Sequence, residues 1–401
     1  MLIQFSTQNY LSIKEKIVLS MLASNDKEHP EHLLPYSKKE HCLKSAVIYG
    51  ANASGKSNVL NAFWFMVNYV LVSHEKQLNK RTERVPFKFD QTTLKEPSSF
   101  EVIFTIDEIR YTYGFSATDK EIVEEYLFYY PNGRPALIFE RKNTNKYRFT
   151  VDIDLQNNLK DRNSHNKLYL STAANWNYEK VKPVFEWFAS CAIITKNSVA
   201  DSYNMDVEQL RDDEYRSIIA SMLRVADFGI QDLAIRDKDT VIPVLKKTNA
   251  YSNVDAVHQV KNESGEIVSY TLNMSEESDG TNSYFKLIGL VKKILDEGGL
   301  LVADEMDAHL HPLLTKHIVS LFNSAEYNSN GAQLIFTSHN TNLLDLDLLR
   351  RDQIWFTEKD EDFAATDLFS LYDFSVRKDT RVEKSYLLGR YGAIPFIKGG
   401  L

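Results

Sequence analysis

Two features are scarce in this sequence: cysteine and long apolar runs. Cys42 and Cys191 are the only cysteines among 401 residues, which excludes a disulfide framework and a four-cysteine zinc site. The most apolar window, residues 59–72, is interrupted by Asn61 and Asn68 and is shorter than the roughly 20 apolar residues of a membrane span. Residues 1–22 show no pattern of a secretion signal. We therefore expect a cytoplasmic protein without membrane contact.

An excess of positive charge is also missing. The 47 Lys and Arg residues stand against 55 Asp and Glu residues, giving a formal net charge of −8. This balance excludes a surface coated with nucleic-acid-binding basic residues but leaves room for a local basic groove, so DNA binding stays open. Hydrophobic residues make up 43% and charged residues 25%, as in ordinary globular proteins. Without internal repeats or sustained heptads, a long coiled coil is excluded.

The hydrophobic patterns predict an α/β protein with an interrupted core. Residues 46–49 read as a buried strand, and apolar residues then recur at helical spacing from 59 to 71. Alternation from 100 to about 153 indicates an antiparallel β-lobe, and longer periodicities from about 167 to 235 indicate helices. We divide the chain into an N-terminal core half at 1–90, a β-lobe at 91–160, a mainly helical insertion at 161–250 and a C-terminal core half at 251–401.

The predicted strand at 46–49 runs directly into a glycine loop. Residues 50–57 match G-x-x-x-x-G-K-[ST], a pattern whose glycines let backbone N–H groups surround a phosphate. Lys56 is expected to reach the β- and γ-phosphates, and the Ser57 hydroxyl to bind Mg²⁺. An ordinary glycine turn is the alternative. The residues assigned to nucleotide binding are Gly50, Asn52, Ala53, Ser54, Gly55, Lys56, Ser57 and Asn58.

Two later strands end in residues suited to phosphoryl transfer. The apolar run 300–303 leads into Asp304 and Glu305, of which Asp304 is expected to hold Mg²⁺ and Glu305 to orient or deprotonate the attacking water. The run 334–336 leads to His339, which is expected to donate a hydrogen bond to a γ-phosphate. Taken alone, each pattern also fits a purely structural strand end.

A further anion site is predicted upstream of the acidic strand. Ser278 and Gly280 stand at the start of an apolar pattern with helical spacing. A serine at a helix start can bind an anion together with the free N–H groups, although an ordinary N-cap has the same appearance.

The order of these motifs resembles the ATP-binding-cassette head of SMC and RecF proteins. More narrowly, residues 46–58, residues 277–281 and the tail at 388–395 resemble prokaryotic abortive-infection ATPases, namely the RloA/AbiL first component and the ATPase of the PARIS anti-phage system. The resemblance covers most of the chain and is thin over the inserted middle. It implies a P-loop NTPase head that uses ATP and Mg²⁺.

The resemblance also implies how two copies would pair. Ser278, Gly280 and Thr281 correspond to the cassette signature, which in the family meets the γ-phosphate of ATP held by the opposite protomer. Asp307 corresponds to the D-loop, a dimer contact. This signature departs from Leu-Ser-Gly-Gly-Gln at Asp279 and Thr281. We expect ATP-sandwich dimers that act as a sensor or scaffold in anti-phage defence and control a separate effector protein, for which a TOPRIM-type nuclease is a candidate.

Several patterns fit more than one function. Asp152 and Asp154 invite comparison with an OLD-type ATPase-nuclease, and a RecF-like DNA-repair ATPase is the second rival function. The basic run 141–148 fits either a DNA-tracking surface or, more simply, a solvated hairpin turn. Gln91 is the best candidate for a glutamine loop, against a plain surface residue. A set of residues with metal-ligand spacing, for which we favour solvated surface positions, comprises His29, His32, His41 and Cys42.

Overall fold

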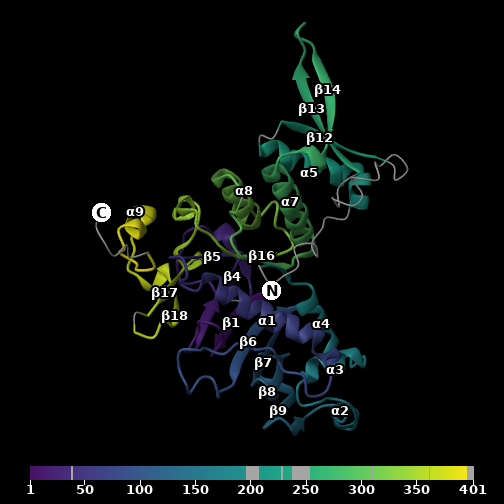
Figure 1. Cartoon of the computed structure of the whole chain (residues 1–401), viewed down its shortest axis with the longest axis vertical. Helices are drawn as coiled ribbons and strands as arrows, with labels where there is room; N and C mark the ends of the chain where they lie inside the picture. Colours follow the sequence, from purple (N-terminus) through teal and green to yellow (C-terminus); the bar gives the residue numbers. More distant parts are fainter. Residues whose placement is uncertain are drawn as a thin grey trace.

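The computed structural model describes residues 1–37, 39–195, 207–226, 229–236, 253–308, 310–360 and 362–394. Figure 1 shows an elongated molecule with a mixed sheet near its middle, an antiparallel sheet at one end and a small sheet with a projecting hairpin at the other. The chain is therefore a mixed α/β protein built from several sheets.

The middle sheet carries the predicted ATPase motifs. In spatial order its strands are β11 (Ala192–Ile194), β15 (Leu300–Ala303), β16 (Gln333–Thr337), β5 (Ser45–Gly50), β17 (Ile354–Lys359) and β18 (Thr366–Ser370). Neighbouring strands are parallel except β17 with β18. Parallel strands end at the same edge, so the residues that follow β5, β15 and β16 come together there.

This sheet separates two hydrophobic cores. Ala46 and Ile48 of β5 pack in the core that includes α1 (Lys56–Val72) and α4 (Lys182–Ala189). Val47 and Tyr49 pack in the other core, with α7 (Asp279–Glu297) and α8 (Pro312–Asn323). Because both faces are covered, the strands consist of nearly continuous apolar residues, which is the pattern seen in the sequence.

The antiparallel sheet contains more of the chain than its predicted lobe. Its strand order is β10 (Lys146–Phe149), β9 (Ala136–Lys142), β8 (Ile122–Tyr130), β7 (Ile109–Ala117), β6 (Ser98–Ile106), β1 (Leu2–Gln8) and β2 (Ile17–Ser20). β1 and β2 precede the glycine loop, yet β1 pairs with β6 in this sheet. Helices α2 (Ile153–Lys160) and α3 (Tyr169–Asn175) follow its last strand.

In the segment expected to be a mainly helical insertion, the described residues form more helix than strand. It contains α3, α4 and α5 (Asp213–Val225), but also β11, which joins the middle sheet, and β12 (Ile230–Ile235). β12 pairs with β13 (Val254–Lys261), which pairs with β14 (Ile267–Asn273) to form the projecting hairpin at the top of Figure 1. The rest of the predicted insertion, at 196–206, 227–228 and 237–250, lies outside the described residues.

Short elements complete the fold. Between β2 and β5 lie the 3-10 helix η1 (Pro30–His32) and the hairpin of β3 (Leu33–Pro35) with β4 (His41–Leu43). Near the C-terminus lie η8 (Arg351–Gln353) and α9 (Val382–Leu387). Among the described residues, no helix combines the length and apolarity needed to cross a membrane.

Candidate functional site

The glycine loop connects β5 to α1 at the carboxyl edge of the middle sheet. Gly55 has φ 113°, and a Cβ there would lie 2.0 Å from Oγ1 of Thr366, so a side chain has neither a favourable backbone angle nor space. No side chain caps the first turn of α1. The N–H of Asn58 donates to the carbonyl oxygen of Gly55 at 2.9 Å, so the N–H groups of α1 before Asn58 are the ones available to an anion, as a phosphate site at a helix start requires.

Lys56 is buried inside this loop. Its ammonium donates hydrogen bonds to the carbonyl oxygens of Gly50 at 2.7 Å and Ala51 at 3.2 Å. Burial lowers the pKa of Lys56, while the nearby carboxylates of Asp304 and Glu305 act in the opposite direction. A buried cation held across the loop by carbonyl groups is well placed to meet phosphate oxygens.

Ser57 and Asp304 lie side by side. The Ser57 hydroxyl donates to Oδ1 of Asp304 at 3.0 Å, and the Thr337 hydroxyl donates to the same oxygen at 2.7 Å. A hydroxyl and a carboxylate are hard oxygen ligands of the kind that Mg²⁺ binds beside substrate phosphates. These residues fit the cation predicted from the sequence, with Ser57 and Asp304 as its protein ligands.

Glu305 occupies an unusual backbone conformation. Its φ is 49°, in the left-handed region that non-glycine residues rarely adopt, and its N–H donates to the Thr337 hydroxyl at 2.6 Å. Thr337 therefore joins Asp304 and Glu305 through one hydroxyl. Strained backbone of this kind is commonly found at functional sites, where the surrounding contacts maintain it.

His339 follows β16 at the same edge. Its backbone N–H donates to Oδ2 of Asp307 at 3.1 Å, so Asp307 positions the histidine within this chain. Oδ1 of the same carboxylate is buried and has no hydrogen-bond partner among the described residues. Asp307 is therefore connected to the site through His339.

The glycine loop, the start of α1 and the strand ends line one cavity of about 470 Å³. The residues lining it come from the loop, from α1 and from three strand ends: Ala51, Asn52, Ala53, Gly55, Lys56, Ser57, Asn58, Glu305, His339 and Lys359. A larger cavity, of about 810 Å³, lies beside α9. The smaller cavity is the candidate nucleotide site, because it contains the phosphate loop and both candidate catalytic residues.

The predicted signature lies outside this cavity. Ser278 caps α7, and its hydroxyl oxygen accepts a hydrogen bond from the N–H of Thr281 at 3.1 Å. None of Ser278, Gly280 and Thr281 lines the cavity. The two predicted anion sites of one chain are therefore separate.

Several residues that support the loop carry no signal in the sequence. Thr366 of β18 donates to the carbonyl oxygen of Ser54, and Thr357 of β17 lies 2.6 Å from the Ser54 hydroxyl, measured between side-chain oxygens. Asn58 donates to Ser12, which contacts Thr366 at 2.7 Å. Threonine is common in strands, so no local pattern distinguishes these contacts. Lys359, which lines the cavity at the end of β17, also stands in no recognisable motif and was not predicted.

Two expectations about surface residues hold only in part, since the run 141–148 does form the hairpin turn between β9 and β10 with most of its residues exposed. Arg141, expected in a solvated hairpin turn or on a DNA-tracking surface, is fully buried and lies 3.8 Å from Glu125. His32 and Cys42 are buried as well, whereas His41 is exposed. In both segments most neighbouring residues are hydrophilic, so the sequence pattern did not indicate that single side chains face the interior.

Asp152 has contacts of an ordinary structural kind, and Gln91 is an exposed residue away from the cavity. Asp152 accepts a hydrogen bond from Tyr178 and forms an ion pair with Lys180 near the start of α2. Gln91 is exposed in a turn and does not line the nucleotide cavity. The surroundings of neither residue indicate a catalytic role.

The sequence matches one family over residues 45–345, which spans β5, the phosphate loop, the acidic strand and His339. The family is described as "AAA domain, putative AbiEii toxin, Type IV TA system". No curated protein matches the chain. Because the matched residues make up most of the 401-residue chain and include the phosphate loop, Asp304, Glu305 and His339, the protein belongs to this family of AAA-type ATPase domains associated with toxin–antitoxin and abortive-infection systems.

Proposed function

We propose that the chain binds ATP with Mg²⁺ and hydrolyses it to ADP and phosphate. We further propose that this cycle controls a separate effector protein in anti-phage defence. One observation carries the enzymatic part: Glu305 and His339 line the same cavity as Lys56 and Ser57, and Ser57 contacts Asp304. Positioning and charge stabilisation account for most of the catalysis of phosphoryl transfer. The side chains in this cavity are of the types that these two effects require.

Each side chain has a distinct role in this proposal. Lys56 and the free N–H groups of α1 bind the phosphates, and Ser57 with Asp304 binds the cation, which supplies charge neutralisation on the phosphate oxygens. Glu305 orients the attacking water and accepts its proton. His339, fixed by Asp307, donates a hydrogen bond to the γ-phosphate.

The first prediction separates hydrolysis from binding. We expect Glu305→Gln to retain ATP while hydrolysis slows by about 10²-fold or more, because an amide is nearly isosteric with a carboxylate yet accepts no proton. The measurements are phosphate release at saturating ATP and Mg²⁺, and ATP affinity by calorimetry.

The control is Glu326→Gln, which makes the same change at an exposed position of the C-terminal half. Asp304→Asn serves as a comparison and should also shift the Mg²⁺ concentration needed for activity, since Asp304 touches Ser57. Hydrolysis by Glu305→Gln at the parent rate would show that the base lies elsewhere.

The defence role rests on the family, whose description names a putative AbiEii toxin and a type IV toxin–antitoxin system. A sensor of this kind requires an effector encoded nearby, whereas a RecF-like protein requires ATP-dependent DNA binding by the purified chain alone. An OLD-type protein requires nuclease activity of the chain itself. Phage challenge with the neighbouring gene deleted, together with DNA binding and nuclease assays on the pure protein, separates the three functions.

A further inference from the structure

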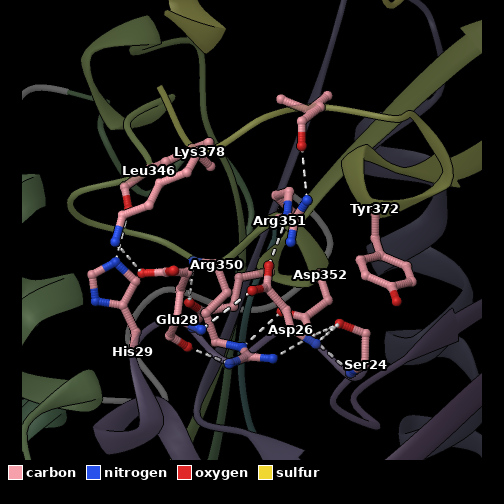
Figure 2. A network of polar contacts seen from close by, with 12 residues as sticks. Ser24, Asp26, Glu28, His29, Leu346, Arg350, Arg351, Asp352, Tyr372 and Lys378 are labelled. Atoms are coloured by element: carbon pink, nitrogen blue, oxygen red, sulfur yellow. Dashed lines mark hydrogen bonds and ion pairs between the residues drawn. The ribbon is translucent and has the colours of Figure 1, made fainter. Parts of the chain in front are cut away.

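A second polar site lies outside the nucleotide cavity, where the N-terminal loop at residues 24–32 meets the C-terminal half of the chain. Ser24 donates two hydrogen bonds to Asp352, at 2.8 Å from its N–H and 2.7 Å from its hydroxyl (Figure 2). Arg351 pairs with Asp26 at 2.7 Å, and Lys378 pairs with Glu28 at 2.7 Å. This loop is therefore held in place at three points before it reaches η1.

Three potential metal ligands converge at η1. Nδ1 of His29 lies 3.2 Å from Oε1 of Glu31, and Nε2 of His32 lies 3.5 Å from the same oxygen. The two imidazole rings stack with centroids 4.6 Å apart and planes 9° apart. Because a metal ion lies in the plane of each imidazole that binds it, one of the rings must turn for both nitrogens to bind the same ion. A tetrahedral ion about 2.0–2.2 Å from each ligand keeps the ligand atoms roughly 3.3–3.6 Å apart, so these separations suit a shared cation.

The other ring nitrogen of His29, Nε2, already forms a hydrogen bond within the protein. Nε2 of His29 lies 2.7 Å from the carbonyl oxygen of Leu346, as the dashed line in Figure 2 marks. A carbonyl oxygen only accepts hydrogen bonds, so Nε2 carries the hydrogen. In the neutral ring Nδ1 then presents its lone pair toward Glu31.

The same logic applies to His32. Its Nδ1 lies 2.9 Å from Oε1 of Gln353, and that oxygen also accepts the N–H of Arg350 at 2.9 Å. The Gln353 amide nitrogen donates to Ser45 at 2.8 Å, which fixes the orientation of the amide. Nδ1 of His32 is therefore the donor, and Nε2 presents its lone pair toward Glu31.

Three hydrogen-bond acceptors thus face one another, and none of them donates to another; the Glu31 carboxylate accepts the backbone N–H of its own residue. We propose that His29 Nδ1, His32 Nε2 and a Glu31 carboxylate oxygen bind a Zn²⁺ ion. Imidazole nitrogens favour zinc over Mg²⁺, and the carbonyl and amide oxygens behind the rings are the outer partners that zinc-binding histidines usually have. The Glu31 side chain is 49% exposed, which leaves a coordination position for water.

The expected role of the ion is to fasten the N-terminal loop to the C-terminal half. His29 and His32 contact Leu346 and Gln353, and β17 begins at Ile354 directly after Gln353. The site is independent of the proposed ATPase activity, because none of its three ligands lines the nucleotide cavity. Its neighbours His41 and Cys42 are not part of it: His41 is exposed, and Cys42 packs with Ile3 and Leu34.

The test is zinc binding by the full chain after removal of metals with a chelator. We expect calorimetry with Zn²⁺ to give one equivalent per chain, and Co²⁺ to give the visible absorption of a site with nitrogen and oxygen ligands. Glu31→Gln and His29→Asn should each lower zinc affinity about tenfold or more, because each removes a ligand. Both residues are partly exposed, so these variants should fold, as circular dichroism will verify.

Two controls locate the ion. His41→Asn removes an exposed histidine from the adjacent hairpin, and Asp304→Asn removes the carboxylate at the phosphate loop; both should retain the zinc equivalent. Zn²⁺ should raise the melting temperature of the parent protein and not that of Glu31→Gln. Equal zinc affinity of the parent and Glu31→Gln, or loss of the equivalent in either control, would overturn the proposal.

Discussion

Lys56 holds the shape of the loop, and in the proposed function it also binds the nucleotide. Its ammonium is buried and satisfied by two loop carbonyls, so these contacts hold the loop in a curved form. The same ammonium is expected to turn to phosphate oxygens when ATP enters. Moving the ammonium from the loop carbonyls to the phosphate oxygens requires little rearrangement of solvent, because the charge is already desolvated at the site.

The second prediction follows from this role. We expect Lys56→Ala to weaken ATP binding about 10- to 100-fold, since hydrogen bonds to charged groups contribute roughly 1.5–3 kcal/mol. Calorimetric titration with ATP and Mg²⁺ measures the loss. The control Lys293→Ala removes an exposed lysine from α7 and should bind like the parent. Unchanged affinity in Lys56→Ala would refute the assignment of the loop.

Gly55 permits a third prediction at the same scale. Alanine there would meet Thr366 and adopt φ 113°, so we expect Gly55→Ala to lower the free energy of unfolding by roughly 1–3 kcal/mol and to impair ATP binding. Urea denaturation measures the first effect.

Gly265 provides the matched control. Its φ is 81°, but a Cβ there would have no atom within 4 Å. Gly265→Ala therefore carries backbone strain without the clash, and it should destabilise the protein less and leave ATP binding intact. If the two variants behave alike, contact with Thr366 does not determine the shape of the loop.

Helices and strands with a clear local sequence pattern could be predicted. The sheet partners of strands that pair with distant parts of the chain could not. β5, the glycine loop and α1 are encoded by a continuous apolar run, a motif and helical spacing, and the structure has them in that order. β1 has an ordinary strand pattern, and nothing in it reveals that it pairs with β6, about 100 residues later. β11 is short, and it joins β15 only through a contact across more than 100 residues.

The site divides in the same way. Lys56, Ser57, Asp304, Glu305 and His339 stand in motifs, and the parallel sheet brings their strand ends to one edge. The residues that support them, such as Thr337 and Thr366, are strand threonines without a distinguishing pattern. Their roles depend on tertiary contacts, which spacing along the chain does not encode.

The buried pair of Glu125 and Arg141 organises the antiparallel lobe at the scale of elements. Glu125 of β8 accepts the N–H groups of Tyr169 at 2.6 Å and Leu170 at 2.9 Å, at the start of α3. Arg141 of β9 donates to the carbonyl oxygen of Lys167 at 2.7 Å. Burial raises the pKa of Glu125, and the Arg141 charge opposes that rise. The pair therefore connects two strands to the helix that follows them.

The fourth prediction concerns this pair. Arg141→Gln leaves the Glu125 carboxylate buried without its cation, so we expect the free energy of unfolding to fall by roughly 3–5 kcal/mol. Arg148→Gln on β10 changes an exposed arginine of the same basic run and should alter stability by less than about 0.5 kcal/mol. Chemical denaturation of both variants provides the measurement. Equal stability of the two variants would contradict a structural role for Arg141.

At the scale of the whole molecule, the two predicted anion sites of one chain do not meet. The start of α7, with Ser278, contributes nothing to the cavity that holds the phosphate loop. Oδ1 of Asp307 is buried without a hydrogen-bond partner among the described residues, although its other oxygen positions His339. Both features suit an arrangement in which a second copy completes the site. ATP would then stabilise the pair through its higher affinity for the closed form.

The last prediction tests this pairing. Glu305→Gln should retain ATP and accumulate as a dimer, which light scattering detects as a doubling of mass when ATP is added. Adding Ser278→Arg should abolish the dimer, because a bulky cation replaces the small hydroxyl at the start of α7, while calorimetry should find ATP binding to each phosphate loop unchanged. Ser190→Arg, at an exposed position after α4, controls for the added charge and should still dimerise. Glu305→Gln that stays monomeric with ATP would refute the paired site.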